Sequence, residues 1–407
     1  MVTGNWIDPA TNYELPVTNY QSPLRYLSLF LSLSLFLAAC TSPSPTAALT
    51  APPTVLLTAQ ASTPVGGATA TTAAPAATET TVLPATTAAP TAMPLMVGYV
   101  TGASGAAGVL DALQATAKGF SWPVQTAPSG DADGLTKLAQ AGAQVIVVDG
   151  AGLADAARAA AVAFPKTYFI SLTPPGQSGQ AGQGDPLPNL LSLGAGPTRE
   201  DQIGFMACVV AGYATRAKVL TAVGYTTDAT GLKYRNGFLH GVRLSCSRCR
   251  VDFVDLTDLN DGPTAAGKAR LNASLSSDVV FAAAGAASAD ALQAAAGAGA
   301  WVLGVDADIY QSVFGGGTAK GAGKVLASAY FDPGAALTAA LKAYQAGRPW
   351  TGALPYSAAT GAVTLAPIRV STDVLSDLDR SDANAVLAQL ADGELDTGID
   401  PTTGNEL

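Results

Sequence analysis

The chain has 407 residues, a net charge of −9, one histidine and four cysteines. The acidic balance argues against a nucleic-acid-binding protein, because phosphates are held by basic surfaces. The only imidazole is that of His240, so a catalytic triad would have to use this residue, and no G-x-S-x-G turn is present.

An export signal is predicted at residues 24–40. The twelve-residue apolar run 26–37 suits a signal peptide, and a membrane-spanning helix needs about 20 such residues. The run leads into Ala38-Ala39-Cys40, a junction that resembles a bacterial lipobox. Lipid attachment requires a small residue before the cleaved bond and a thiol after it, and Ala39 and Cys40 supply both. We therefore expect lipidation at Cys40.

Two further N-terminal segments are predicted to lie outside the folded body. Residues 1–23 contain no lysine or arginine, which is unusual ahead of a signal peptide, so we interpret them as an extension before a true start near Leu24. Residues 41–94 consist almost entirely of Thr, Ala, Pro and Ser. Such a segment cannot bury a core and is predicted to be a disordered tether.

The remaining segment, 95–407, exceeds the usual size of one core and predicts two lobes. Short β-rich runs alternate with alanine-rich helical stretches, which is typical of βαβ units. We predict an α/β fold with two doubly wound parallel-sheet lobes. Strands are expected at 96–100, 145–149, 168–172, 219–224, 251–256, 279–282, 301–305 and 325–330, and helices at 106–118, 135–141, 153–164, 199–216, 234–244, 265–275, 289–296 and 334–346.

Two local motifs have both a functional and a structural interpretation. The pair Cys246 and Cys249 is compatible with a disulfide, with free thiols, or with a metal or redox site, and we favour the disulfide outside the cytoplasm. The run 262–268 fits the first seven positions of a phosphate-binding loop, but Ala269 stands where Ser or Thr must meet magnesium. We expect an ordinary helix start there, and no metal site.

Ligand-binding candidates lie where predicted strands end. Ligands of open α/β sheets bind beyond the carboxyl ends of the strands. Asp306 could accept hydrogen bonds from ligand hydroxyl groups or bind a cation, or it could instead cap a helix or brace a loop, and Asp149 has the same ambiguity. The candidates are Thr101, Ser104, Asp149, Gly285 and Asp306.

From residue 199 onward the chain resembles the basic membrane protein family of ABC-transporter substrate-binding lipoproteins, whose characterised members include purine-nucleoside binders. A glycine-containing helix, a second helix and two strand ends are each similar to a family pattern, and they follow in the family's order. The matching stretches are 200–212, 236–242, 277–285, 301–306 and the tail 391–395.

The resemblance implies two α/β lobes joined by a hinge, like type I periplasmic binding proteins. It implies that Gly285 and Asp306 lie beside the sugar moiety of a ligand and that Asp149 lies near a pocket loop. One departure is evident, because the loop 101–108 contains neither the carboxylate nor the aromatic ring with which the family clamps the base.

We therefore expect a solute-binding lipoprotein of an ABC importer, not an enzyme. It would capture a small polar, nucleoside-like solute in an interlobe cleft and deliver it to a permease, without a cofactor. We expect a monomer held by its lipid at the outer face of the cytoplasmic membrane. The alternative is a degenerate relative that acts as a ligand sensor or a structural envelope lipoprotein.

Overall fold

The computed structural model describes residues 95–103, 105, 106, 108–173 and 185–407. Cys40, the expected signal peptide and tether, and Ser104 lie outside the described residues. Within those ranges, none of the helices combines the length and apolar character that a membrane crossing requires.

The first lobe is built on a parallel six-stranded sheet, here called sheet A, with the strand order β11-β5-β4-β3-β1-β2. Its central strands consist mostly of buried apolar residues, as expected for a sheet covered on both faces. The strands are β1 (Val97–Thr101), β2 (Val124–Thr126), β3 (Val145–Asp149), β4 (Tyr168–Leu172), β5 (Leu190–Leu193) and β11 (Gly352–Leu354).

The second lobe repeats this arrangement in sheet B, with the order β12-β10-β9-β8-β6-β7. All its pairs are parallel except the pair of β10 and β12, which is antiparallel. The strands are β6 (Val219–Gly224), β7 (Arg250–Asp255), β8 (Val279–Ala282), β9 (Trp301–Gly304), β10 (Val325–Phe331) and β12 (Val363–Leu365).

Helices connect the parallel strands, as right-handed βαβ units require. The lobe of sheet A contains α2 (Val109–Gly119), α3 (Ala132–Gln140), α4 (Ala154–Ala163) and α10 (Pro333–Gln345). The lobe of sheet B contains α5 (Glu200–Ala214), α6 (Ala229–Ser245), α7 (Gly262–Leu275), α8 (Ser288–Gly297), α9 (Ile309–Ser312) and α11 (Asp377–Asp392). The predicted fold class, two doubly wound α/β lobes, is confirmed.

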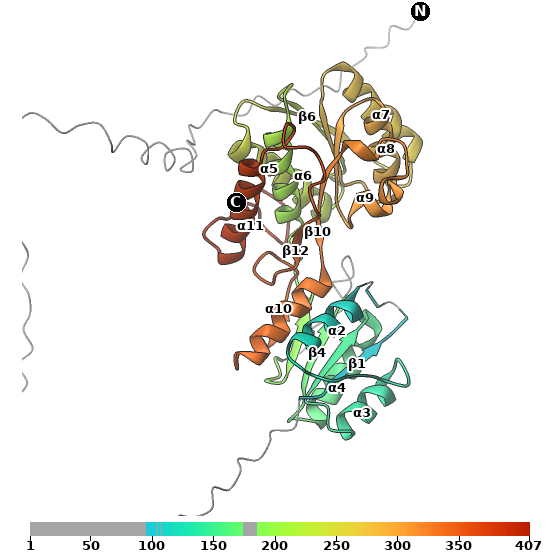
Figure 1. Ribbon diagram of the computed structural model, residues 1–407, viewed down its shortest axis with the longest axis vertical. Helices are drawn as coiled ribbons and strands as arrows, with labels where there is room; N and C mark the ends of the chain where they lie inside the picture. Colours follow the sequence, from blue (N-terminus) through green and yellow to red (C-terminus); the bar gives the residue numbers. More distant parts are fainter. Residues whose placement is uncertain (1–94, 104, 107, 174–184) are drawn as a thin grey trace, which may run out of the picture. The chain divides into compact units, whose positions relative to one another are not determined.

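The chain passes from one sheet to the other three times. It leaves sheet A after β5, returns after β10 to form α10 and β11, and crosses again before β12. Helix α10 lies against α2 (Figure 1), where the hydroxyls of Thr116 and Thr338 are 3.0 Å apart. At the third crossing, Tyr356 is fully buried and packs beside Phe331.

Helix α5 is buried along nearly its whole length, because sheet B, α6 and α11 surround it. Its first turn holds a buried ion pair between Glu200 and Lys233 of α6, and the Lys233 ammonium also donates to the Thr198 carbonyl at 2.7 Å. Arg199 is bonded to Asp201. These pairs fix the start of α5, and with it the first crossing, to the second lobe.

Four strands and two helices were not predicted. Strands β2, β11 and β12 have three residues each, too few to show an alternating pattern, and β5 has four residues. Helix α9 is a single turn. Helix α11 is longer, but only Ala383, Val386 and Leu390 of its residues are buried, so its apolar face is narrow.

Candidate ligand-binding site

Asp306 lies at the carboxyl edge of sheet B, two residues after β9 ends. Its backbone φ is +69°, a left-handed conformation that is uncommon outside glycine and tends to occur at functional sites. The residue is exposed. Its Oδ1 accepts a 3.3 Å hydrogen bond from the Tyr234 hydroxyl of α6, and Oδ2 has no partner among the described residues. One carboxylate oxygen is therefore free for a ligand.

The Asp306 carboxyl lies in poorly hydrated surroundings although solvent reaches it. This desolvation raises its pKa above the usual range, the Tyr234 hydrogen bond opposes the rise, and the negative charge of Glu200 adds to it. The environment therefore favours ligands that can donate hydrogen bonds to Asp306.

Asp308, two residues further on, has a structural role. It is the N-cap of α9, accepting a 3.0 Å hydrogen bond from the Tyr310 amide. It also pairs with Arg369 at 2.9 Å, and the Arg369 guanidinium lies 4.3 Å above the Tyr310 ring. The two aspartates of this loop thus have different roles, and only Asp306 has a free oxygen.

Gly285 lies at the neighbouring strand end, because β8 pairs in parallel with β9. It is exposed and has a φ of +56°, which leads the chain into a short 3₁₀ turn. The loop before α7 closes over this turn, since the Ala287 amide donates to the Leu259 carbonyl at 2.9 Å. The fold therefore brings Gly285 and Asp306 to adjacent positions on one sheet edge.

Asp149 ends β3 on sheet A but is only 1% exposed. Its Oδ2 accepts a 2.8 Å hydrogen bond from the Tyr99 hydroxyl, and its Oδ1 accepts a 3.0 Å bond from the Ala106 amide. Burial raises its pKa, and both hydrogen bonds oppose the rise. Both oxygens are thus bonded to the protein, and Asp149 braces the loop that joins β1 to α2.

Thr101 is exposed at the end of β1, directly beside Asp149 in the strand register. Its hydroxyl donates a long, 3.2 Å bond to the Gly102 carbonyl and is also hydrogen-bonded to the side chain of Tyr99. The adjacent Gly130 approaches the Thr101 carbonyl so closely that a Cβ atom would overlap it. Of the predicted residues, Thr101 and Asp149 thus share the edge of sheet A.

Three other sequence features have structural roles. His240 contacts Glu406 of the C-terminal segment, with Nε2 and Oε1 3.1 Å apart. The run 262–268 forms the first half of α7, capped by Asp261, whose carboxylate accepts from the Thr264 amide. Cys246 and Cys249 form a disulfide with a Cα–Cα distance of 5.4 Å. In the described part of the chain, no cluster of metal-binding side chains occurs.

Two tyrosines of this region escaped sequence-based prediction. Tyr234 lies on α6 and fixes Asp306, and Tyr225 follows β6 directly at the carboxyl edge of sheet B. Tyr225 could have been noticed by its position, since it is the first residue after a strand of the sheet. Nothing in the sequence indicates that Tyr234 reaches Asp306, because 72 residues separate them.

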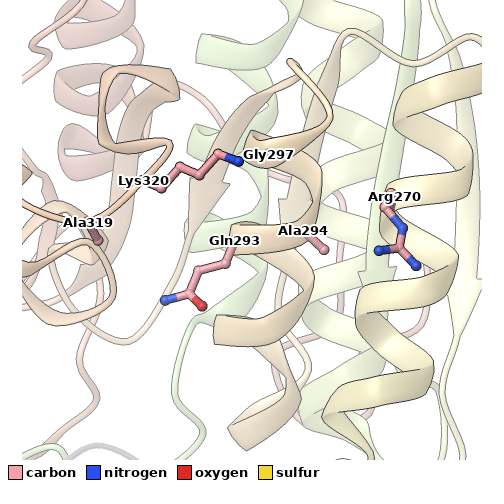
Figure 2. Close-up of a pocket in the computed structure, with 6 residues that line it drawn as sticks. All are labelled: Arg270, Gln293, Ala294, Gly297, Ala319 and Lys320. Carbon is pink, nitrogen blue, oxygen red and sulfur yellow. The ribbon is translucent and has the colours of Figure 1, made fainter.

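A cavity of about 440 Å³ lies elsewhere, lined by α7, α8 and the segment after α9. Figure 2 shows the side chains of Arg270, Gln293 and Lys320 around it. The lining residue Gly297 is the last residue of α8, and the amino end of β9 follows it in the chain, so this cavity is near the amino ends of the strands. Since ligands of this fold class bind at the carboxyl ends, we assign the candidate site to the strand ends.

Comparison with known proteins identifies the family of the chain. The family model described as "ABC transporter substrate-binding protein PnrA-like", Bmp, matches residues 100–388. No curated protein matches the chain. The family and the fold are those of substrate-binding proteins, not of enzymes.

Solved structures share the fold at low identity. A solute-binding protein of an ABC transporter system from Conexibacter woesei DSM 14684 is 19% identical, with a TM-score of 0.53, and the match covers 76% of this chain and 99% of that chain. A transcriptional activator of the comK gene from Bacillus halodurans is 16% identical, with a TM-score of 0.53 and coverage of 74% and 99%. The chain belongs to the Bmp family of PnrA-like ABC-transporter substrate-binding proteins, which bind small solutes outside the cytoplasm for delivery to a permease.

Proposed function

We propose that this chain is a lipoprotein, anchored through Cys40, that captures a neutral, hydroxyl-bearing, nucleoside-like solute between the carboxyl edges of its two sheets. The observation that carries the proposal is Asp306, an accessible carboxylate held by Tyr234 with one free oxygen beside Gly285. A sugar moiety presents hydroxyl groups that donate to such an oxygen.

The charges around Asp306 favour a neutral or cationic solute. Lys233 is engaged by Glu200, and Arg369 is engaged by Asp308. A negatively charged solute would therefore meet a carboxylate with neither of these cations free to balance it, and the repulsion would weaken its binding. This argument separates nucleosides from nucleotides as ligands.

Capture would involve a hinge motion about the three crossings between the sheets, of the kind that two-lobed binding proteins use. The first crossing contains Gly194 and Gly196, both at positive φ, and the start of α5 that follows is tied to the second lobe by Lys233. The ligand-bound, closed form would dock onto the permease. A lipid on Cys40, followed by the segment 41–94, would keep the body close to that membrane partner.

The test is direct binding to the purified full chain, measured by native mass spectrometry and isothermal titration calorimetry. The panel contains inosine, guanosine, adenosine, uridine, D-ribose, D-arabinose and the nucleotide inosine monophosphate. We expect at least one nucleoside to bind and the nucleotide to bind at least tenfold more weakly. Tighter binding of the nucleotide, or no binding of any nucleoside, would contradict the proposal.

The anchoring part has its own test. Expression of the chain and of its Cys40→Ser variant in a lipoprotein-processing bacterium should give a membrane-associated wild type. The variant should be released from the membrane or retain an uncleaved signal. Identical fractionation, together with a wild-type mass that lacks a lipid, would overturn the lipoprotein assignment.

A second candidate function is ligand sensing without import. The loop 101–108 contains no aromatic side chain and no carboxylate, so one side of the expected base clamp is missing. A protein of the same fold has been described as a transcriptional activator, which illustrates that a fold does not fix a function. A nucleoside that binds the chain but is not transported by cells would favour this candidate.

A further inference from the structure

Tyr225 is the first residue after β6, a central strand of sheet B that pairs with β8. The carboxyl ends of β6, β8 and β9 therefore present Tyr225, Gly285 and Asp306 along one edge. Tyr225 lies outside the five stretches whose sequence resembles the family.

The ring of Tyr225 is held in a fixed position by the first turn of α6. A Cβ atom built on Gly231 would lie only 2.6 and 2.7 Å from ring atoms Cδ2 and Cε2. The turn itself is capped by Asp228, whose carboxylate accepts from the Gly231 amide at 2.9 Å. Because the ring packs directly on this turn, the direction of its hydroxyl is determined by the helix.

The hydroxyl of Tyr225 has no hydrogen-bond partner among the described residues. The residue is 8% exposed. Its hydroxyl oxygen does not belong to the fully buried polar atoms that lack a partner, so this oxygen is accessible. Tyr234 differs, since its hydroxyl is already bonded to Asp306. A polar group of a nearly buried residue usually has a partner, so this hydroxyl is open to a partner that the described residues do not supply.

The surroundings keep this phenol protonated. Burial raises the pKa of Tyr225 to about 12, and the negative charges of Asp228, Asp306 and Glu200 add to the effect. Tyr225 is therefore a hydrogen-bond donor at every physiological pH, and Asp306 is an acceptor at the same edge of sheet B.

We propose that Tyr225 is a specificity-determining residue, whose hydroxyl donates to one oxygen of the solute while the free Oδ2 of Asp306 accepts from a neighbouring hydroxyl. Tyr234 is the positioning residue that fixes the other oxygen of Asp306. A donor next to an acceptor matches two adjacent hydroxyl groups of a sugar. The inference rests on the proposed function and adds the residue that selects the sugar's hydroxyl pattern.

The experiment is a set of paired binding measurements by calorimetry on the full chain. Wild type, Tyr225→Phe and the control Tyr344→Phe are titrated with inosine, 2′-deoxyinosine, 3′-deoxyinosine and 5′-deoxyinosine, and with D-ribose and D-arabinose. Tyr344 lies in the other lobe, stacks on Tyr168 at 5.0 Å and has no hydroxyl partner in the described structure. Thermal unfolding of each variant reports whether the fold is intact.

We expect Tyr225→Phe to weaken binding about tenfold, the usual effect of one lost hydrogen bond, and Tyr344→Phe to leave it unchanged. Removing one particular sugar hydroxyl should weaken binding to wild type but have little further effect on Tyr225→Phe. If every deoxy probe lost the same affinity for wild type and for Tyr225→Phe, or if Tyr225→Phe bound inosine as tightly as wild type, the role of Tyr225 would be refuted and the proposed function would stand. A wild type that binds none of the probes would overturn it together with the proposed function.

Discussion

Each of the two sheets has an aspartate at the carboxyl end of a strand, and the two aspartates differ in exposure and in hydrogen bonding. Asp149 at the end of β3 is 1% exposed and bonded through both oxygens to Tyr99 and Ala106. Asp306 after β9 is exposed and bonded through one oxygen only. The first aspartate organises a loop, and the second is available to a ligand. The strand-end position alone therefore does not distinguish the two aspartates, and their hydrogen bonds do.

The largest expected effect is on stability, at the edge of sheet A. Asp149→Ala removes the acceptor of the Tyr99 hydroxyl and of the Ala106 amide, and we expect it to lower the free energy of unfolding by about 2–4 kcal/mol. Urea unfolding followed by circular dichroism measures this change. A loss below about 1 kcal/mol would mean that Asp149 does not brace the loop, and the contrast between the edges would fail.

A smaller effect is expected where the neighbouring loop meets β1. Gly130→Ala would push a Cβ atom into the Thr101 carbonyl, with the carbonyl carbon 3.2 Å away, and backbone cannot move aside as a side chain can. We expect a loss of about 1–3 kcal/mol in the same unfolding experiment. Gly119→Ala is the matched control, because nothing lies within 4 Å of its added Cβ. Equal stability of the two variants would show that the contact is not tight.

The smallest stability effect is expected at Asp306. Its pKa is raised in the folded state, so its ionisation opposes folding, and the wild type loses stability as pH rises above the ordinary aspartate value of 3.8. Asp306→Asn removes this loss, so the free energy of unfolding of the variant should increase relative to that of the wild type between pH 4 and pH 7. Unfolding curves at several pH values measure the difference. A variant that becomes relatively less stable as pH rises would contradict the environment described for Asp306.

Most of the fold could be predicted from the sequence, because buried parallel strands leave a clear signal. The runs that form β3, β4, β6 and β8 were predicted with the boundaries that the structure has. Edge strands such as β2 and β11 were missed, since they are short and partly exposed and their pairing depends on a neighbour far away in the chain.

The candidate site was predictable in position but not in detail. Periodicity located Asp149 and Asp306 at strand ends. Their partners, Tyr99 and Tyr234, are 50 and 72 residues away, so the difference between a braced and a free carboxylate exists only in the folded chain. The same holds for Tyr225, whose orientation depends on its contact with Gly231 of α6.

The central claim is that Asp306 contacts the solute and Asp149 supports the fold. The most direct test compares Asp306→Asn with Asp149→Asn, measuring inosine and guanosine binding by calorimetry and unfolding by urea on the same preparations. We predict that Asp306→Asn weakens binding at least tenfold at nearly unchanged stability, and that Asp149→Asn lowers stability while the folded protein binds within about threefold of wild type. The reverse pattern, or equal effects of the two variants on binding, would contradict the account.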